Sequence, residues 1–271
     1  MSTHNSLVVD RDQMHTVHPA PWLRGFANLL RKEHSLWWDT RKWLIHLVLW
    51  PLFLNGLVVV VASSLALEPA HTAVDIATMV TMLFFLVAAQ AAGFGAVVAT
   101  QSAVVGEKQR GTAAWILSKP VSRSAFVLAK LVAQALAFLS LAVVLPSTIF
   151  YAQSVLLWGA LPDPTVFVGA VLLVMLHVLF YLSLTLASGT FFRGSGPVAG
   201  VAVGALLLGL AAQDHVGRLA DVLPWKLPVL AGLVATHESV AKVLPVTVIA
   251  VITSIGLLVA AALWRFKREE F

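Results

Sequence analysis

Long apolar runs with almost no charge dominate this sequence and limit what it can fold into. Six such runs can be drawn, at about residues 44–67, 76–100, 125–151, 165–190, 197–213 and 243–264. A helix rises 1.5 Å per residue, so about 20 residues cross the ~30 Å hydrocarbon core of a bilayer. Only 11% of the 271 residues are charged, against about a quarter in a typical soluble domain. We therefore predict an all-α integral membrane protein in which residues 44–271 form one six-span domain.

The distribution of lysine and arginine predicts the orientation of these spans. Lysines and arginines occur before the first span, after the second and in the tail, and Arg193 follows the fourth, whereas residues 63–75 and 152–164 contain neither residue type. The positive-inside rule then places both termini in the cytoplasm of a plasma or inner membrane. Residues 214–242 fall outside, and their apolar stretch Leu227–Ala235 is too short to cross, so we predict an outer hairpin that is re-entrant or interfacial.

The residues before the first span predict two further pieces. Residues 1–20 are polar and rich in histidine, as expected of a flexible tail. Residues 21–43 predict an amphipathic helix lying in the cytoplasmic interface, its charged residues including Arg31, Lys32 and Glu33; a simple topological stop is the alternative. The apolar residues on helical spacing are Trp22, Leu23, Phe26, Leu29, Leu30 and Leu36.

Motifs that would give the chain a chemistry of its own are missing from the sequence. It has no Gly-Lys pair, so it contains no phosphate-binding loop of the common nucleotide-binding type. It also has no cysteine, no His-Glu-x-x-His and no Gly-x-Ser-x-Gly. The net charge of +5 comes from residues at span ends and not from a basic stripe. We expect no catalytic residue, no metal site and no nucleic-acid partner.

A few polar and small residues lie inside the predicted spans. Asn55, Gln90, Gln134 and His177 are the main polar ones, and interhelical hydrogen bonding is the ordinary role for such residues. A carrier driven by an ion gradient usually needs charged residues at this depth, and none is evident. Gly196, Gly200 and Gly204 recur every four residues. This spacing fits packing within the chain, a homodimer contact or a helix beside a pathway.

The connection after the second span has more detail than a plain loop needs. Gly111 predicts a bend, Thr112 a side-chain cap for a short helix over 112–118, and Pro120 its end. Ser122 then predicts a cap for the third span. A short rigid cytoplasmic helix of this kind suits docking into a soluble partner; a well-capped turn is the alternative.

The same region resembles the signature of ABC-2 type permeases, the membrane subunits of a class of ATP-binding-cassette transporters. The matching residues are Glu107, Arg110, Gly111, Thr112, Ser118, Pro120, Val121, Ser122, Arg123, Ala129 and Lys130. Asn28–Trp43 is similar to the amphipathic elbow helix of that family, and six spans with both ends inside also match. Ala113 and Ala114 depart from the pattern, which usually has larger apolar residues there.

The resemblance implies the ABC-2 permease fold, a second permease copy as a homodimer, contact with membrane lipid, and separate ATPase subunits that bind ATP and magnesium. This chain would then be no enzyme by itself and would hold no cofactor. The coupling helix, 107–118, and the elbow would contact the ATPase. Within the coupling helix the implied residues are Glu107, Lys108, Arg110, Gly111, Thr112, Trp115 and Ser118. Asn55, Gln90 and the three spaced glycines would lie at the dimer contact or the pathway.

The expected function is therefore export of a substrate, driven by ATP hydrolysis in the partner; the apolar, uncharged spans favour a lipid-like or amphipathic substrate over a small ion. Two alternatives stay open on sequence alone: a membrane scaffold or assembly factor that transports nothing, and an ion-coupled secondary transporter.

Overall fold

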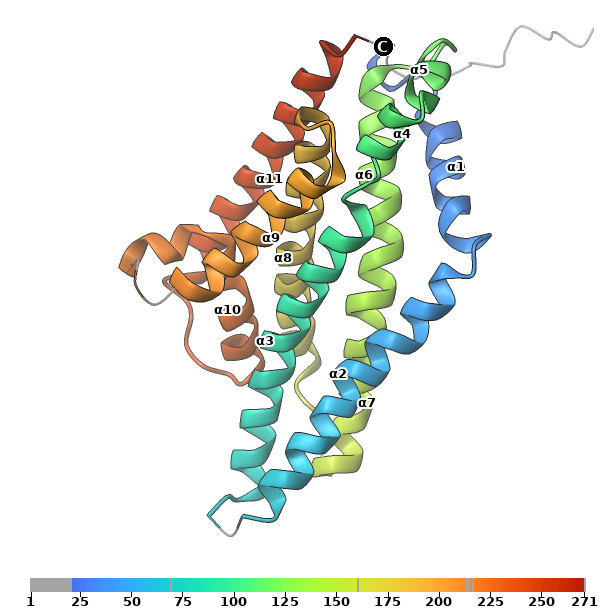
Figure 1. Cartoon of the computed structure of the whole chain (residues 1–271). Helices are drawn as coiled ribbons and strands as arrows, with labels where there is room; N and C mark the ends of the chain where they lie inside the picture. The colour runs from blue at the N-terminus through green and yellow to red at the C-terminus, as the bar shows by residue number, and fades with distance from the viewer. Residues whose placement is uncertain (1–20, 69, 160, 213–214, 216, 271) are drawn as a thin grey trace, which may run out of the picture.

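The computed structural model describes residues 21–68, 70–159, 161–212, 215 and 217–270, and the regular elements in these ranges are all helical (Figure 1). The predicted tail, 1–20, lies outside the described residues. The elements in the first part of the described chain are η2 (Pro21–Leu23), α1 (Phe26–Trp38), α2 (Lys42–Ala66), α3 (Ala73–Thr100), α4 (Val105–Gln109) and α5 (Thr112–Leu117). The remainder are α6 (Arg123–Leu139), the π-helical turn η3 (Ser140–Val144), α7 (Leu145–Trp158), α8 (Pro164–Phe191), α9 (Ser195–Ala212), η4 (Gly217–Val222), η5 (Pro224–Lys226), α10 (Leu227–Ala235) and α11 (Leu244–Lys267).

Five helical segments are long and apolar enough to cross a membrane. They are Lys42–Ala66, Ala73–Gln109, Arg123–Trp158, Pro164–Phe191 and Leu244–Lys267. Each overlaps one of the predicted spans. Most ends lie within three residues of the prediction, but the second and third segments continue to Gln109 and Trp158, nine and seven residues past the predicted ends. The remaining predicted span, 197–213, corresponds to α9, whose 18 residues reach about 27 Å and are marginal for the ~30 Å core. The chain is a multi-pass helical membrane protein, and its sixth crossing stays a prediction.

The third long segment changes helical pitch in its middle. It runs through α6 and α7 with a π-helical turn between them. Pro146, at the start of α7, has no backbone N–H to continue the regular pattern, which explains the local widening. The Asn55 amide of α2 donates to the Pro146 carbonyl at 3.2 Å. The predicted polar residue Asn55 thus fastens α2 to this irregular turn.

The core of the bundle lies between α3, α8 and α10. Small residues on α3, among them Ala89, Ala92 and Ala96, are fully buried, so neighbouring helices approach closely. A stacked aromatic cluster closes the core farther along the bundle, where the rings of Phe84 and Phe150 lie 4.1 Å apart. By contrast, α2 and α11 expose most of their apolar side chains. These outer faces suit lipid or another membrane chain.

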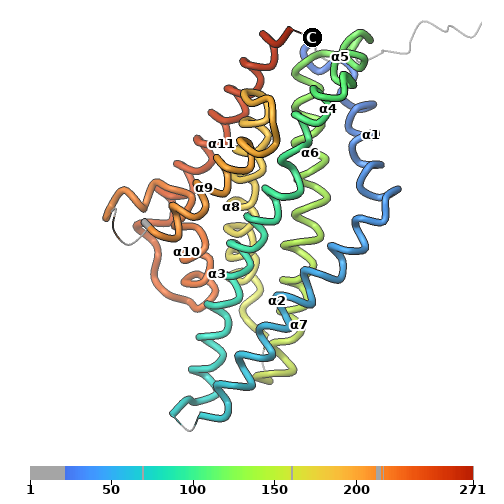
Figure 2. Tube along the Cα trace, viewed as in Figure 1, coloured from blue at the N-terminus to red at the C-terminus, as the bar shows by residue number. Residues whose placement is uncertain are grey.

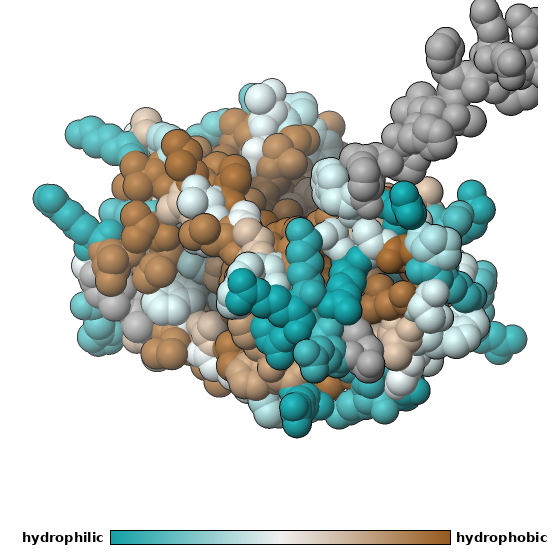
Figure 3. Space-filling view, turned by 90° about the horizontal axis from the view of Figure 1, so that it is seen from above, coloured by the Kyte–Doolittle hydropathy of each residue, from teal (hydrophilic) through white to brown (hydrophobic). Residues whose placement is uncertain are grey.

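One end of the bundle collects segments that are far apart in sequence. There α4 and α5 lie beside the beginnings of α1 and α6 and the end of α11 (Figures 1 and 2). The turns from α2 to α3 and from α7 to α8 lie at the opposite end. Seen from the α4–α5 end, hydrophilic side chains gather in the middle and on the right of the face, while hydrophobic ones predominate on its left (Figure 3). This end carries the candidate functional site.

Candidate functional site

The segment from Glu107 to Ser118 folds as two short helices joined at a glycine. Gly111 has φ +71°, a left-handed conformation that glycine adopts without steric cost. The prediction that Thr112 caps the second helix is wrong: Thr112 is the first residue of α5, and its hydroxyl donates to the Glu107 carbonyl at 3.2 Å. Because α4 ends at the bend, the backbone carbonyl of Glu107 is left without a helical N–H partner and accepts from the Thr112 hydroxyl instead. The predicted end at Ser118 falls one residue earlier, at Leu117.

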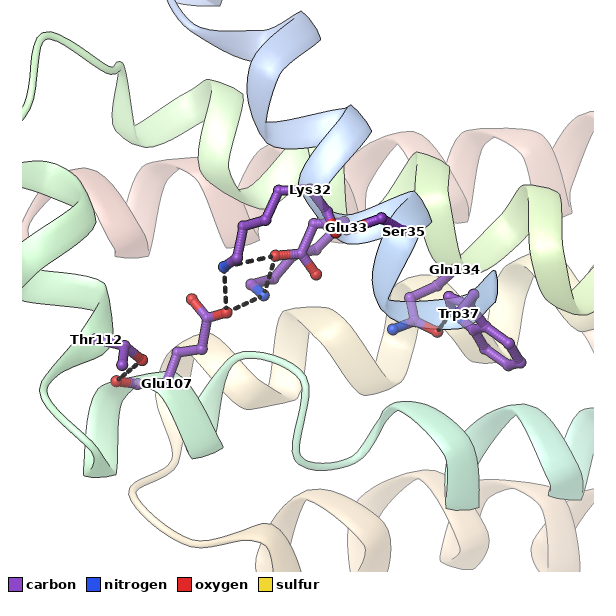
Figure 4. Close-up of polar contacts among 8 residues, drawn as sticks. Lys32, Glu33, Ser35, Trp37, Glu107, Thr112 and Gln134 are labelled. Atoms are coloured by element: carbon purple, nitrogen blue, oxygen red, sulfur yellow. Dashed lines mark hydrogen bonds and ion pairs between the residues drawn. The ribbon is translucent and has the colours of Figure 1, made fainter. Parts of the chain in front are cut away.

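Four charged side chains from three elements meet behind this segment (Figure 4). The Lys130 ammonium of α6 lies 2.9 Å from one carboxylate oxygen of Glu33 in α1 and 2.9 Å from one of Glu107 in α4. Lys32 lies 3.0 Å from the same Glu107 oxygen and 3.3 Å from Glu33. Glu33, Glu107 and Lys130 are each at most 6% exposed. We call these four residues the charge cluster.

The local sequence explains why α1 and α6 meet on polar residues. Glu33 and Trp37 are four apart on α1, and Lys130 and Gln134 are four apart on α6, so each pair shares one helix face. The two helices make two polar contacts one turn apart: Glu33 binds Lys130, and the Trp37 indole donates to the Gln134 side chain at 3.0 Å (Figure 4). The predicted apolar face of the elbow was therefore only partly right. The buried face of α1 is Leu29, Glu33 and Trp37, whereas Leu36 is exposed.

Burial and charge act in opposite directions on Lys32. Its partial burial lowers its pKa, but hydrogen bonding to Glu107 and the charges of Glu107 and Glu33 outweigh this and raise the pKa above its usual value. Lys32 therefore stays charged at physiological pH. Arg31, the third residue predicted for the elbow, points outward and is exposed.

The Pro-Val-Ser-Arg stretch after α5 holds the chain ahead of α1. The Ser122 hydroxyl donates to the Trp22 carbonyl at 2.5 Å, and the Ser122 N–H donates to the Arg24 carbonyl at 3.0 Å. Gly25 packs so closely on Val121 that an added Cβ would lie 2.8 Å from it. The predicted cap is confirmed, because the Ser122 oxygen also accepts from the Ala125 N–H at 3.0 Å.

Lys108 of α4 and Arg123 at the start of α6 bind the C-terminal tail and the end of α8. Lys108 lies 2.8 Å from Glu269 and donates to the Thr190 carbonyl at 3.3 Å. Arg123 donates to the carbonyls of Lys267 and Glu269 at 2.6 and 2.7 Å. The α4–α5 region therefore contacts the elbow, α8 and the tail after α11 together. A displacement of this region would therefore displace or strain all three of these segments.

The predicted coupling residues divide into two groups. Glu107 and Lys108 point into the protein, whereas Arg110, Gly111, Thr112, Trp115 and Ser118 are exposed. The indole of Trp115 is the main apolar feature of the exposed group at 64% exposure, with the Lys119 ammonium 3.6 Å from its ring centre. We call Arg110–Ser118 the docking face.

The other predicted site residues lie outside the charge cluster and the docking face. An added Cβ at Gly196, Gly200 or Gly204 would meet nothing within 4 Å, so this stripe does not serve packing within the described chain. Gln90 and Asn55 each have a buried side-chain oxygen without a hydrogen-bond partner among the described residues. The structure brings neither into contact with the charge cluster.

Sequence reasoning named Glu33, Lys130 and Gln134 separately but did not pair them. The available signal was the shared spacing of four residues on two helices. It was overlooked because Lys130 sits at the start of a span, where a lysine is normally explained by topology. Among the described residues, no three His, Asp or Glu side chains gather as metal ligands would.

The fold and the site together define a multi-pass membrane protein with a short helical element bonded to several spans at one end of the bundle. Residues 27–224 match the family model described as ABC-2 family transporter protein. Since the match covers well over half of the chain, the protein belongs to the ABC-2 transporter family. Such permeases are generally non-catalytic membrane subunits that pair with an ABC ATPase. A comparison with curated proteins finds no match.

Proposed function

We propose that this chain is the membrane subunit of an ATP-driven exporter whose ATPase subunit docks on Arg110–Ser118. The observation that carries the proposal is that the α4–α5 region has an exposed outer side and an inner side that is bonded to other helices. Its outer side presents Trp115, and its inner side bonds to α1, α8 and the tail after α11. A motor that moves the docking face would therefore move several membrane elements at once. The movement becomes transport only if the spans have two arrangements that the motor can favour in turn.

Pairing with a second copy is part of the proposal. The stripe Gly196, Gly200 and Gly204 has open space above it, and small residues spaced by four allow another helix to approach closely in a membrane. The exposed apolar side chains of α2 offer a further surface for that copy or for lipid. A pathway between two protomers would then run beside α2, α3 and α9.

Topology supports placing this end in the cytoplasm of a plasma or inner membrane. The first turn of α6 contacts both Trp22, before α1, and Lys267, at the end of α11. Both ends of the described chain therefore lie at the same end of the bundle, which requires an even number of crossings. Five long helices supply an odd number, so we assign the sixth crossing to α9 with the hairpin that follows it. The lysines and arginines at this end favour the cytoplasmic side.

Trp115→Ala tests the docking face. Aromatic residues at the centre of an interface commonly contribute about 2 kcal/mol or more, so we expect the affinity for the ATPase subunit to fall by about thirtyfold or more. The control is Leu67→Ala, which removes an 84% exposed apolar side chain from the opposite end. Affinity is measured by binding of the purified ATPase subunit to the reconstituted permease.

A second variant separates docking from coupling. Glu107→Gln keeps the docking face but weakens the charge cluster, so the ATPase should still bind while its hydrolysis becomes uncoupled from transport. Deleting Gly111 and Thr112 should also uncouple hydrolysis from transport, but because both residues belong to the docking face, that variant tests docking and coupling together. Unchanged binding in Trp115→Ala, together with unchanged coupling in Glu107→Gln, would refute the proposal.

A further inference from the structure

A polar cavity of about 520 Å³ opens beside the charge cluster, between α1, the start of α2, the end of α3, α4 and α6. Its buried floor is formed by Glu33, Trp37, Glu107 and Lys130. Its rim is exposed and mixes charged with apolar residues: Lys42 and Arg110, with Leu36 and Val98 beside them. Volumes of this order accommodate small ligands or a lipid headgroup.

The floor of the cavity contains an unsatisfied acceptor. One oxygen of Glu107 binds both Lys32 and Lys130 (Figure 4). Its other oxygen, Oε2, is buried and has no hydrogen-bond partner among the described residues. A buried carboxylate oxygen without a donor is costly, and groups that bind ligands are a recurring explanation for such an atom. This oxygen calls for an N–H or O–H donor.

The rim of the cavity has cationic side chains that lack a negatively charged partner among the residues that the structure describes. Lys42 and Arg110 form no ion pair within the described part of the chain, and both line the opening. The two lysines of the charge cluster are already occupied by Glu33 and Glu107. The uncompensated charge at the rim is therefore positive, and it suits a phosphate or carboxylate group.

From the floor outward, the cavity thus requires a donor, then an anion, then an apolar group near Leu36 and Val98. We propose that it binds the zwitterionic headgroup of an amphiphile that ends in a primary ammonium followed by a phosphate, as a phosphoethanolamine lipid does. The ammonium donates to Glu107 Oε2, and the phosphate lies between Lys42 and Arg110. The hydrocarbon chains stay outside, over Leu36 and Val98.

Other ligand classes satisfy only part of this order. An anionic headgroup without an amine, such as phosphoglycerol, offers Glu107 Oε2 only a neutral hydroxyl, which makes a weaker hydrogen bond to a carboxylate than an ammonium does. A choline headgroup carries the positive charge but has no N–H to donate. A simple cation leaves Lys42 and Arg110 uncompensated. A primary ammonium joined to a phosphate meets all three requirements, so headgroup chemistry is the discriminating variable.

The test uses the purified full-length chain in detergent, without an ATPase. Equimolar dioleoyl lipids with phosphoethanolamine, phosphocholine and phosphoglycerol headgroups are added, and native mass spectrometry measures which are retained. We expect preferential retention of the phosphoethanolamine lipid. Hydrogen bonds to charged groups contribute enough that Lys42→Gln and Arg110→Gln should each lower that retention by about tenfold. Arg110→Lys should restore most of it.

Lys119→Gln is the matched control, because it removes an exposed lysine that contacts Trp115 and does not line the cavity. Equal retention of the three lipids, or Lys42 and Arg110 variants that behave like Lys119→Gln, would overturn the proposal. Competition by soluble glycerophosphoethanolamine would show that the headgroup alone suffices; no competition would show that the site takes a lipid. The assay contains no ATP, so its failure would leave the proposed coupling standing, and failure of the coupling test would leave this site standing.

Discussion

Lys130 is the residue on which the charge cluster depends. Its ammonium bridges two carboxylates from different elements at 2.9 Å each, and its side chain is only 3% exposed. Burying charges is expensive, so such a cluster contributes little net stability when complete. Losing one member is different, because the charges left behind are no longer compensated. Lys32, which is 42% exposed, can replace Lys130 only in part.

We therefore predict that Lys130→Met destabilises the protein by about 3 kcal/mol, the lower end of the range for removing one partner of a buried ion pair. The free energy of unfolding in mixed micelles, measured by denaturing-detergent titration, checks this value. Lys119→Met is the control, because that lysine is exposed and should change stability by less than about 0.5 kcal/mol. Equal stability of the two variants would contradict the bridging role.

At the scale of helices, the elements could be predicted and their faces could not. Apolar runs are local in sequence, so five spans and the short helix at 227–235 were found with ends correct to within a few residues, except where α7 continues to Trp158. The buried face of α1 was missed because it depends on α6. Hydrophobic periodicity predicts that Leu36 is buried and Glu33 is exposed. The structure instead buries Glu33, because it pairs with Lys130 of α6.

The open stripe on α9 gives a prediction at this scale. Gly200→Leu should leave the stability of the single chain nearly unchanged, because nothing lies within 4 Å of the added Cβ. It should nevertheless shift a dimer toward monomer, because a leucine prevents close approach of a second helix. Light scattering of the protein in detergent measures the association state.

Gly256→Leu provides the matched control for that experiment. It adds the same side chain at another open helical glycine, on α11, outside the spaced stripe. If both variants stay equally dimeric, α9 is not the contact. If Gly200→Leu also lowers the stability of the single chain, the stripe serves packing within it.

For the whole molecule, the contacts of α6 determine which segments share an end of the bundle. Ser122 and Arg123 are adjacent in sequence and bind, respectively, the chain before α1 and the tail after α11. Charge counting along the sequence placed both termini on one side, and these contacts place the described ends together. The sequence could not show that one Ser-Arg pair makes both connections, because the partners lie more than 90 residues away on either side.

The absence of cysteine from the sequence makes this topology directly testable with single-cysteine variants. We expect Ser118→Cys and Arg268→Cys to react with a membrane-impermeant maleimide only after the membrane is opened. Leu161→Cys, at the opposite end of the bundle, should react in intact cells. Because these positions are exposed, a failure to react reports the side of the membrane and not burial.

Arg218→Cys, in the turn after α9, is the informative position for the sixth crossing. If α9 crosses, Arg218→Cys reacts from outside together with Leu161→Cys. If it does not, Arg218→Cys shares the behaviour of Ser118→Cys, and five crossings would have to separate Trp22 from Lys267. That outcome is incompatible with the bonds that both make to the first turn of α6, so it would overturn the arrangement of the whole bundle and not only the assignment of α9.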